Sequence, residues 1–440
     1  MSMKIFNYFV LLLLFFSFVF AGDIDENELF SDTNIIGEVK NLSESEKEKE
    51  GFGLSGRLAS SLGYNFHRKY LENKIGSESN SFSFGMEGDL FFDVRLKKGY
   101  KVFCDLWVAS DYQGNPQYKN LYNPLNGTSE TLIETNSMVL KMKELFLDYN
   151  LNHIAYLRFG KQFLKWGVTY FWNPVDLINR EKKSFTDLEA TREGSWGIKL
   201  HIPYKTVFNF YSFVDFTDVK KIEDSALATK LEFVLGNTEI GFSGWFKKEF
   251  YSVYGIDLST RILGFDVKAE SSFSYGDNRR YIKDFFSGVP TERKITNELV
   301  YRVALNIYKA FEFLDKKDRI TTMVEIFYNS AGYTNNIFED ETKRNYFIYN
   351  GLYYPNEYGK LYAFFMLGYK DLFISDLNFS LNYLCNFTQY SSMLGLLVSY
   401  SPIDEVSTTF ATYINIGEEK REYTYTEIPL SMTLGVEMKF

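Results

Sequence analysis

The last thirteen residues of the chain alternate between apolar and polar or small side chains almost without a break. The apolar positions fall on every second residue: Ile428, Leu430, Met432, Leu434, Val436, Met438 and Phe440. Successive side chains of a β-strand point to opposite faces, so this period of two predicts a strand with one apolar face. Such a face packs on the core of a soluble sandwich or faces lipid in a membrane barrel. The segment alone leaves both folds open.

The N-terminal segment has the composition of an export signal. Residues 1–21 combine a basic start at Lys4, an unbroken apolar stretch and a small residue at Ala21. We expect a secretory signal peptide cleaved after Ala21, because the apolar stretch is short for the alternative, an uncleaved membrane anchor. Residues 22–50 are rich in Asp and Glu, and we interpret them as an acidic periplasmic N-terminal arm, with an inserted plug or a partner-binding tail as the alternative.

Composition favours the membrane barrel. Aromatic residues make up 18% of the chain, with 43 Phe and 33 Tyr, yet 24% of the residues are charged and the mean hydropathy is −0.22. A helical membrane protein is far more hydrophobic than this. The longest uncharged stretch, residues 377–403, also alternates with a period of two, which indicates strands and not a spanning helix. Aromatic girdles around a half-polar barrel give this mixture.

Residues 51–440 show the two-faced strands and alternating connections of such a barrel. Segments such as 84–96 and 320–328 are apolar on one face and charged on the other, which is costly in a dry core but suits a water-filled lumen. Short connections, such as 236–237, alternate with long ones, such as 330–358. The sequence therefore predicts an all-β fold, a transmembrane antiparallel β-barrel of about 18 strands, with 16 as the alternative, short periplasmic turns and long extracellular loops.

One segment, GKQFLKWGVTYFWNPVDLINR at residues 160–180, is the most distinctive motif of the chain. Its characteristic residues are Gly160, Lys161, Gln162, Trp166, Gly167, Asn173, Pro174, Asp176 and Asn179. They resemble the G-[RK]-Q-x3-W-G…N-P-x-D motif of the DUF1302-like porins of bacterial outer membranes, and alginate-export barrels share a weaker form of its start. The resemblance implies a barrel of this class and covers about a twentieth of the chain.

The motif opens the long connection at residues 166–190, for which we consider two roles. Trp166 and Trp172 are placed to pin the loop, Asn173 and Pro174 to make a turn, and Asp176 to accept backbone hydrogen bonds. In the first role the loop folds into the pore and forms a constriction. In the second it stabilises only the rim of the barrel.

Charged side chains on the expected inner face are the other candidate pore-lining residues. They are Arg57, Glu87, Asp89, Asp93, Arg95, Arg158, Lys199, Arg302 and Glu325. Arranged across the lumen, they create a transverse field that orients solutes and tunes ion selectivity. The alternative is that most form cross-strand pairs that stabilise the wall.

The C-terminal residue adds a second resemblance. A terminal Phe440 after an amphipathic strand is similar to the assembly signal of bacterial outer-membrane barrels, although the usual aromatic two positions earlier is Met438 here. This resemblance implies recognition by the barrel-assembly machinery. It places the protein in the cell outer membrane, in contact with lipid and lipopolysaccharide or their equivalent, and leaves open a homo-oligomer.

Catalysis, metals and nucleic acids find little support. The chain has three histidines and two distant cysteines, and no spacing nominates a catalytic triad, a metal site or a cofactor site. A net charge of −9 argues against nucleic acid as a partner. We therefore expect a protein that is not an enzyme and carries no cofactor and no metal.

The sequence favours an outer-membrane porin or channel through which small hydrophilic solutes diffuse passively or with weak selectivity. A first alternative is a substrate-specific transporter or polysaccharide exporter, based on aromatic side chains expected inside the lumen: Phe91, Phe103, Trp107, Tyr156, Trp245, Tyr308 and Phe364. A second alternative is a surface adhesin or structural barrel that uses the loop at residues 330–358.

Overall fold

The fold was analysed in a computed structural model. It describes residues 50–68, 80–96, 99–113, 117–123, 128–134, 138–179, 182–188, 192–286 and 289–440. The expected signal peptide and all but the last residue of the acidic arm lie outside these residues. The wall strands are β1 Gly51–Phe66, β2 Ser81–Arg95, β3 Lys101–Gln113, β6 Met138–Leu151, β7 Ala155–Gln162, β8 Ser195–Tyr204, β9 Phe208–Asp215, β10 Ala226–Leu235, β11 Thr238–Lys247, β12 Val253–Ile262, β13 Phe265–Tyr275, β16 Leu299–Phe313, β17 Lys316–Asn329, β18 Leu361–Tyr369, β19 Leu377–Asn386, β20 Ser391–Ile403, β21 Val406–Gly417 and β22 Leu430–Lys439.

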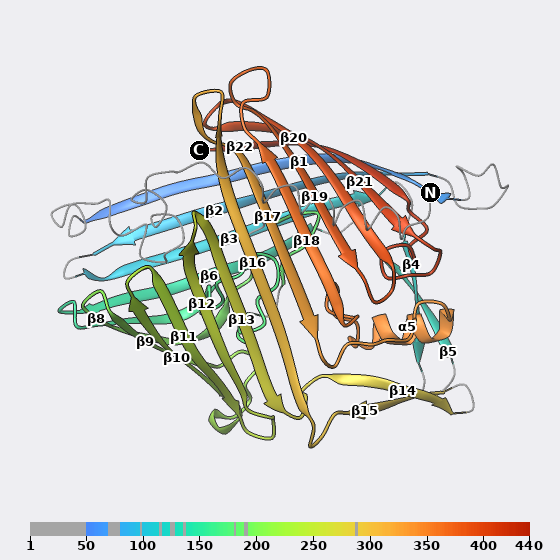
Figure 1. Ribbon diagram of the computed structural model, residues 1–440, viewed down its shortest axis with the longest axis horizontal. Helices are drawn as coiled ribbons and strands as arrows, with labels where there is room; N and C mark the ends of the chain where they lie inside the picture. The colour runs from blue at the N-terminus through green and yellow to red at the C-terminus, as the bar shows by residue number, and fades with distance from the viewer. Residues whose placement is uncertain are drawn as a thin grey trace.

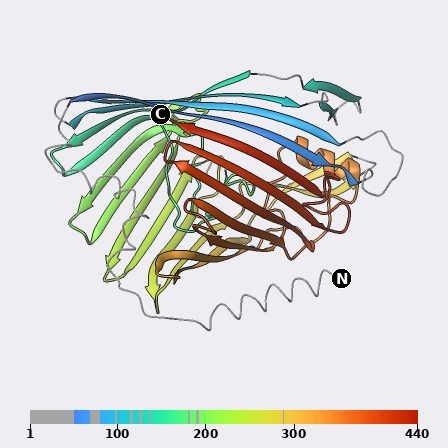
Figure 2. The ribbon, with the colours of Figure 1, turned by 90° about the horizontal axis from the view of Figure 1, so that it is seen from above.

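These strands form one sheet that closes on itself. Among the described residues the sheet has 18 strands, and each strand pairs antiparallel with the next wall strand along the chain. The first and last strands also pair, with Arg57 opposite Lys439 and Leu62 opposite Leu434. Figures 1 and 2 show the resulting ring of tilted strands. The prediction of an antiparallel barrel of about 18 strands is confirmed, and closure leaves the sheet no free edge.

The C-terminal residue completes the seam between β22 and β1. The amide of Gly56 donates to the carbonyl of Phe440 at 2.8 Å, and the amide of Phe440 donates back to Gly56 at 3.0 Å. The ring of Phe440 occupies the space that a side chain at residue 56 would take. A Cβ added to Gly56 would lie 2.4 Å from Cζ of Phe440. The terminal alternation therefore belongs to a barrel and not to a sandwich.

Connections alternate between short turns and long loops, as the sequence predicts. The turn between β10 and β11 and the turn between β16 and β17 have two residues each. Three long loops contain structure of their own: the hairpin β4 Gln117–Asn123 with β5 Thr128–Glu134, the hairpin β14 Arg280–Phe286 with β15 Val289–Lys294, and the helix α5 Glu341–Tyr349. A short 3-10 helix, η2 Ile222–Asp224, lies in a fourth loop. The two hairpins and α5 gather at the same end of the barrel (Figure 1).

Register fixes which side chains face the lumen. Arg57 lies opposite Asp89, and their side chains form an ion pair, so this alternate set of positions on β1 and β2 points inward. The other set is apolar and exposed, with Leu54, Leu58 and Leu62 about half exposed. An apolar outer belt on a polar lumen is the pattern of a barrel that spans a membrane. The described part of the chain contains no helix of the length and hydropathy needed for a membrane span.

Candidate functional site

The segment between β7 and β8, residues 163–194, enters the barrel at the motif. Gly160 lies near the end of β7 with φ of +126°, and a Cβ there would lie 2.2 Å from the carbonyl oxygen of Leu145. Only glycine fits this combination of positive φ and close approach. The side chain of Gln162 is fully buried beside it. Figure 2 shows the green trace of this segment inside the ring of strands. We call residues 163–179 and 182–188 the inner loop.

Glu325 of β17 holds the inner loop at its middle. Its carboxylate accepts hydrogen bonds from three consecutive backbone amides, those of Tyr170 at 2.9 Å, Phe171 at 3.1 Å and Trp172 at 2.7 Å. The side-chain amide of Asn306 on β16 donates a fourth bond at 2.8 Å. Glu325 is fully buried, so these donors satisfy a charge that water does not reach. It lies beneath the loop and not on an open pore surface.

Glu270 of β13 holds the preceding turn in the same way. Its carboxylate accepts from the amides of Val168 and Thr169 and from the Thr169 hydroxyl, and the amide of Val175 donates at 3.3 Å. A Cβ at Gly167 would meet this carboxylate at 2.5 Å, which explains the glycine of the motif. Two buried carboxylates on different strands therefore fix the path of the loop backbone.

Aromatic packing adds to these hydrogen bonds. The ring of Trp172 stacks on Phe327 with 5.3 Å between centroids and 7° between planes, and its Nε1 donates to the carbonyl of Asn356 at 2.8 Å. The ring of Phe171 stacks on Phe364 at 5.0 Å. These four rings belong to an apolar cluster between the loop and strands β16–β21. The largest apolar cluster of the described residues thus lies inside the barrel and covers part of its wall.

The remaining motif residues shape the loop as the sequence predicts. Trp166 is buried with Phe213 of β9 and Ala228 of β10, and its carbonyl accepts from the ammonium of Lys230 at 3.3 Å. The amide of Asp176 donates to the carbonyl of Asn173, which closes the turn at Pro174. The carboxylate of Asp176 accepts from the backbone and side-chain amides of Asn179.

The inner loop therefore covers one side of the lumen. Beyond its start, where the amide of Phe163 donates to Glu144 of β6, its contacts run from Phe213 on β9 through Glu270 and Glu325 to β21, where the Tyr413 hydroxyl donates to the carbonyl of Thr186 at 2.8 Å. We call this side the covered wall. The inward faces of β22, β1, β2, β3, β6 and β7 form the opposite side, which we call the charged wall.

The charged wall carries paired charges, several of which stay partly accessible, although the Asp89 side chain between Arg57 and Lys143 is buried. Arg57 contacts Glu87 at 2.5 Å, Asp89 at 2.7 Å and Glu437 at 3.1 Å, and Arg158 contacts Asp148 at 2.6 Å. The side chains of Arg57, Glu87, Glu437 and Arg158 are 22–35% exposed, whereas Glu325 on the covered wall is fully buried. Each of these pairs joins neighbouring strands. These groups pair along one wall, which matches the interpretation of cross-strand pairs and not that of opposite charges facing each other across the lumen.

The other charged candidates lie at different places. Asp93 contacts Lys101 at 2.9 Å and Arg95 at 3.6 Å on the charged wall. Lys199 on β8 lies opposite Arg158 in the strand register. Arg302 lies near the loop end of β16, where its guanidinium contacts Asp277 at 2.5 Å. No cluster of three or more His, Cys, Asp or Glu side chains suited to a metal occurs within the described ranges.

The aromatic candidates point inward, as expected from the alternation. Phe91 stacks on Phe103 at 6.3 Å, and Phe103 stacks on Phe146 at 5.2 Å, so three neighbouring strands of the charged wall share a row of rings. The guanidinium of Arg158 lies 3.7 Å from the centroid of Phe146. Phe364 differs, because the inner loop buries it completely.

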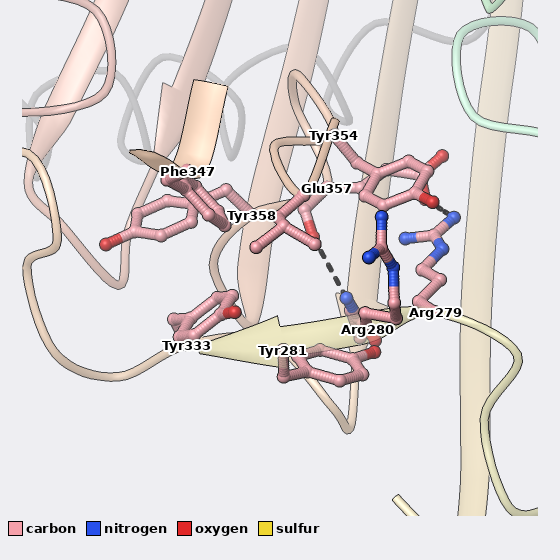
Figure 3. Close-up of a pocket in the computed structure, with 10 residues that line it drawn as sticks. Arg279, Arg280, Tyr281, Tyr333, Phe347, Tyr354, Glu357 and Tyr358 are labelled. Atoms are coloured by element: carbon pink, nitrogen blue, oxygen red, sulfur yellow. Dashed lines mark hydrogen bonds and ion pairs between the residues drawn. The ribbon is translucent and has the colours of Figure 1, made fainter. Parts of the chain in front are cut away.

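The long loop at residues 330–358 packs on the hairpin β14–β15. Figure 3 shows a pocket between them, with Arg279 and Arg280 on one side and Tyr333, Phe347 and Tyr358 on the other. Arg279 pairs with Glu357. Burial by itself raises the pKa of Glu357, but the positive charges of Arg279, Lys182 and Arg302 together outweigh it and hold the pKa below its usual value.

The sequence did not single out several residues that organise the site. Lys143, Asp257, Asn356 and Glu422 are absent from its candidates, although Lys143 contacts Asp89 at 3.0 Å and Asp257 contacts Lys230 at 3.0 Å. Lys143 sits where the register of β3 and β6 shifts, which breaks the alternation that would have revealed it.

Comparisons with known proteins support the fold. No protein-family model matches the sequence, and no curated protein is similar to it. Similar solved structures include OccAB1 of Acinetobacter baumannii (9% identity, 90% of this chain and 99% of that chain, TM-score 0.53). They also include OpdQ of Pseudomonas aeruginosa (9%, 89% and 99%, TM-score 0.51) and OccK8 (OprE) of the same organism (10%, 88% and 98%, TM-score 0.51). At these identities the likeness shows a shared barrel fold.

Proposed function

We propose that this protein is an outer-membrane channel for small hydrophilic solutes, with its constriction between the inner loop and the charged wall. A closed barrel with an apolar outer belt and a polar lumen is the architecture of porins. The observation that carries the proposal is the contrast between the two walls. The inner loop buries the covered wall, while the side chains of Arg57, Glu87 and Glu437 remain accessible.

Passage along the charged wall follows from this contrast. A hydrated solute cannot cross the apolar cluster around Trp172 and Phe364 without displacing the loop. The partly exposed pairs of Arg57 with Glu87 and Glu437 can exchange their contacts with water and polar solutes at modest cost, because exposed pairs are worth only about 0–1 kcal/mol each. Size exclusion by the loop and electrostatic filtering by the wall therefore act together.

We also propose kinship with the DUF1302-like porins on the basis of the motif. Gly160 and Gly167 occupy positions that exclude a side chain, and Asp176 with Asn179 closes the turn of the inner loop. The motif residues thus encode the loop that the proposed constriction requires. This supports a relation to barrels that carry the same motif.

Conductance tests the channel directly. Purified protein is refolded in detergent, shown to be folded by its heat-dependent mobility on a gel, and inserted into a planar lipid bilayer. We expect stepwise conductance increases. Absence of steps from well-folded protein would refute the open channel.

The aromatic row on the charged wall favours a second candidate, a channel selective for ring-shaped or apolar-faced solutes. Phe91 and Phe103 offer stacked faces beside charged groups, with the buried Phe146 packed behind Phe103, an arrangement that suits sugars and aromatic acids. In that case the conductance is small and a matching solute blocks it. A large current that no such solute reduces would favour the weakly selective channel.

We further propose that Phe440 is read by the barrel-assembly machinery. Its ring is 58% exposed at the seam, where another protein can reach it. We also propose that the apolar belt contacts lipid and lipopolysaccharide. Assembly into a homo-oligomer is a further part of the proposal. Deletion of Phe440 should lower the amount of folded barrel in the membrane, and an unchanged amount would argue against this role.

A further inference from the structure

Three outer loops pack into one cap at the mouth of the barrel. The cap comprises residues 277–286, 289–298, 330–360 and 418–429, and it includes β14, β15 and α5. An apolar core joins these segments, with Ile282 from the hairpin, Phe338 and Phe347 from the loop containing α5, and Tyr425 from the last loop. The cap is thus a packed unit and not a set of separate loops.

Asn356 is the point where the cap meets the inner loop. Its backbone has φ of +63°, and three of its polar groups contact three different residues. The carbonyl accepts from Nε1 of Trp172 at 2.8 Å, the amide donates to Glu422 at 3.1 Å, and the side-chain oxygen accepts from the Tyr423 hydroxyl at 3.0 Å. One residue therefore connects a buried carboxylate of the cap with the ring that anchors the loop.

Glu422 is buried at the centre of this contact. Besides the amide of Asn356, its carboxylate accepts from Nδ2 of Asn386 at 2.6 Å, the hydroxyl of Tyr362 at 2.9 Å and the hydroxyl of Tyr353 at 3.2 Å. Within the described residues it forms no ion pair. Tyrosine phenols are the titratable groups that face it: Tyr353, Tyr358, Tyr362 and Tyr423. Burial without a cation raises the pKa of Glu422 to about 7.

We propose that Glu422 and Asn356 are positioning residues for the constriction, and that ionisation of Glu422 loosens the inner loop through Asn356 and Trp172. The proposal rests on the channel function proposed above. It gives the cap a role in gating, because the same residues that close the cap hold the loop inside the lumen.

The direction of the pH effect follows from linkage. A carboxyl whose pKa is higher in the closed cap than in an opened one, where it is near 4.5, stabilises the closed cap in acid. That stability falls as the pH rises towards and through about 7. The ratio of opened to closed cap should then rise about tenfold between pH 6 and pH 8. Fluctuations of the channel current that arise from motion of the inner loop should increase over the same pH range.

Cap opening can be measured without any current. In a variant with Cys104 and Cys385 replaced by serine, Leu352→Cys places a thiol in the buried core of the cap. Its rate of maleimide labelling, divided by the rate for the exposed Ile222→Cys, should rise about tenfold between pH 6 and pH 8. Addition of Glu422→Gln should abolish the rise, and Glu418→Gln, an exposed change on the same loop, should preserve it. A pH-independent ratio in the parent, or a rise that survives Glu422→Gln, would overturn the proposal.

The contact with the loop is tested by Trp172→Phe, which removes the Nε1 donor and keeps a ring to stack on Phe327. The labelling ratio should still rise with pH, whereas the pH dependence of current fluctuations should disappear. If the current fluctuations of Trp172→Phe still depend on pH, ionisation of Glu422 does not act on the inner loop through Trp172. That result would overturn the proposed coupling between the cap and the loop. If no variant conducts, the channel itself fails, while the labelling ratio still decides whether Glu422 controls the cap.

Discussion

Removal of the Glu325 carboxylate is the sharpest perturbation of the inner loop. Glu325→Ala leaves the amides of Tyr170, Phe171 and Trp172 without an acceptor. A buried donor without a partner costs about 1–3 kcal/mol, so the three together cost about 3–9 kcal/mol if the loop stays docked. The burial of two aromatic rings that opposes release contributes about 1.5–3 kcal/mol for each ring.

The penalty is therefore of the same size as the packing of the two rings, about 3–6 kcal/mol in total, that holds this part of the loop. We expect the loop to leave the covered wall for a measurable fraction of the time, because the cost of local release becomes comparable to the cost of keeping three donors buried. The barrel should remain folded, since none of its strand pairings depends on Glu325. Glu325→Gln keeps one acceptor oxygen and should have a smaller effect.

Single-channel recording provides the assay. Glu325→Ala should show larger and noisier conductance than the wild type, with the same heat-dependent gel mobility. Glu312→Ala, on an exposed position of the neighbouring strand, serves as the control and should behave as the wild type. Wild-type conductance and noise in Glu325→Ala would refute the idea that this carboxylate holds a constricting loop.

Three further changes test other parts of the structure. Leu434→Lys places a charge on the lipid face at a cost of about 2–4 kcal/mol and should reduce the folded fraction on a gel, whereas Thr433→Lys on the lumen face should fold and change the conductance. Equal behaviour of the two would contradict the assigned facing. Gly160→Ala should lower barrel stability in urea by about 1–3 kcal/mol because of its φ and the nearby carbonyl, while Gly435→Ala, which has room for a methyl group, should not. Arg57→Ala removes a cation that contacts three carboxylates, so reversal potentials in a salt gradient should shift towards cation preference; an unchanged potential would remove Arg57 from the filter.

The barrel was predictable because its pattern is local. A period of two, repeated between short and long connections, specifies strand facing without any knowledge of neighbours. The turn at Asn173 and Asp176 was predictable for the same reason, since its contacts lie within a few residues. The partner of Glu325 was not predictable, because its donors lie about 155 residues away in the chain.

Charge pairing shows where the sequence stops being informative. The strand pattern places Arg57 and Glu87 inside the lumen, but it does not say whether they face each other across it or lie side by side. Register answers this, because Arg57 lies opposite Asp89 on the neighbouring strand. Asn356 and Glu422 belong to loops without periodicity, and only the folded cap brings them together.

Thiol accessibility inside the lumen is the most direct test of a path along the charged wall. In the background without native cysteines, Glu87→Cys places a thiol on the charged wall and Leu384→Cys places one beneath the inner loop. A charged methanethiosulfonate reagent added to an open channel should reduce the current through Glu87→Cys within seconds to minutes and leave Leu384→Cys unchanged. Block of Leu384→Cys with no effect on Glu87→Cys would place the path on the other side of the loop and contradict the account.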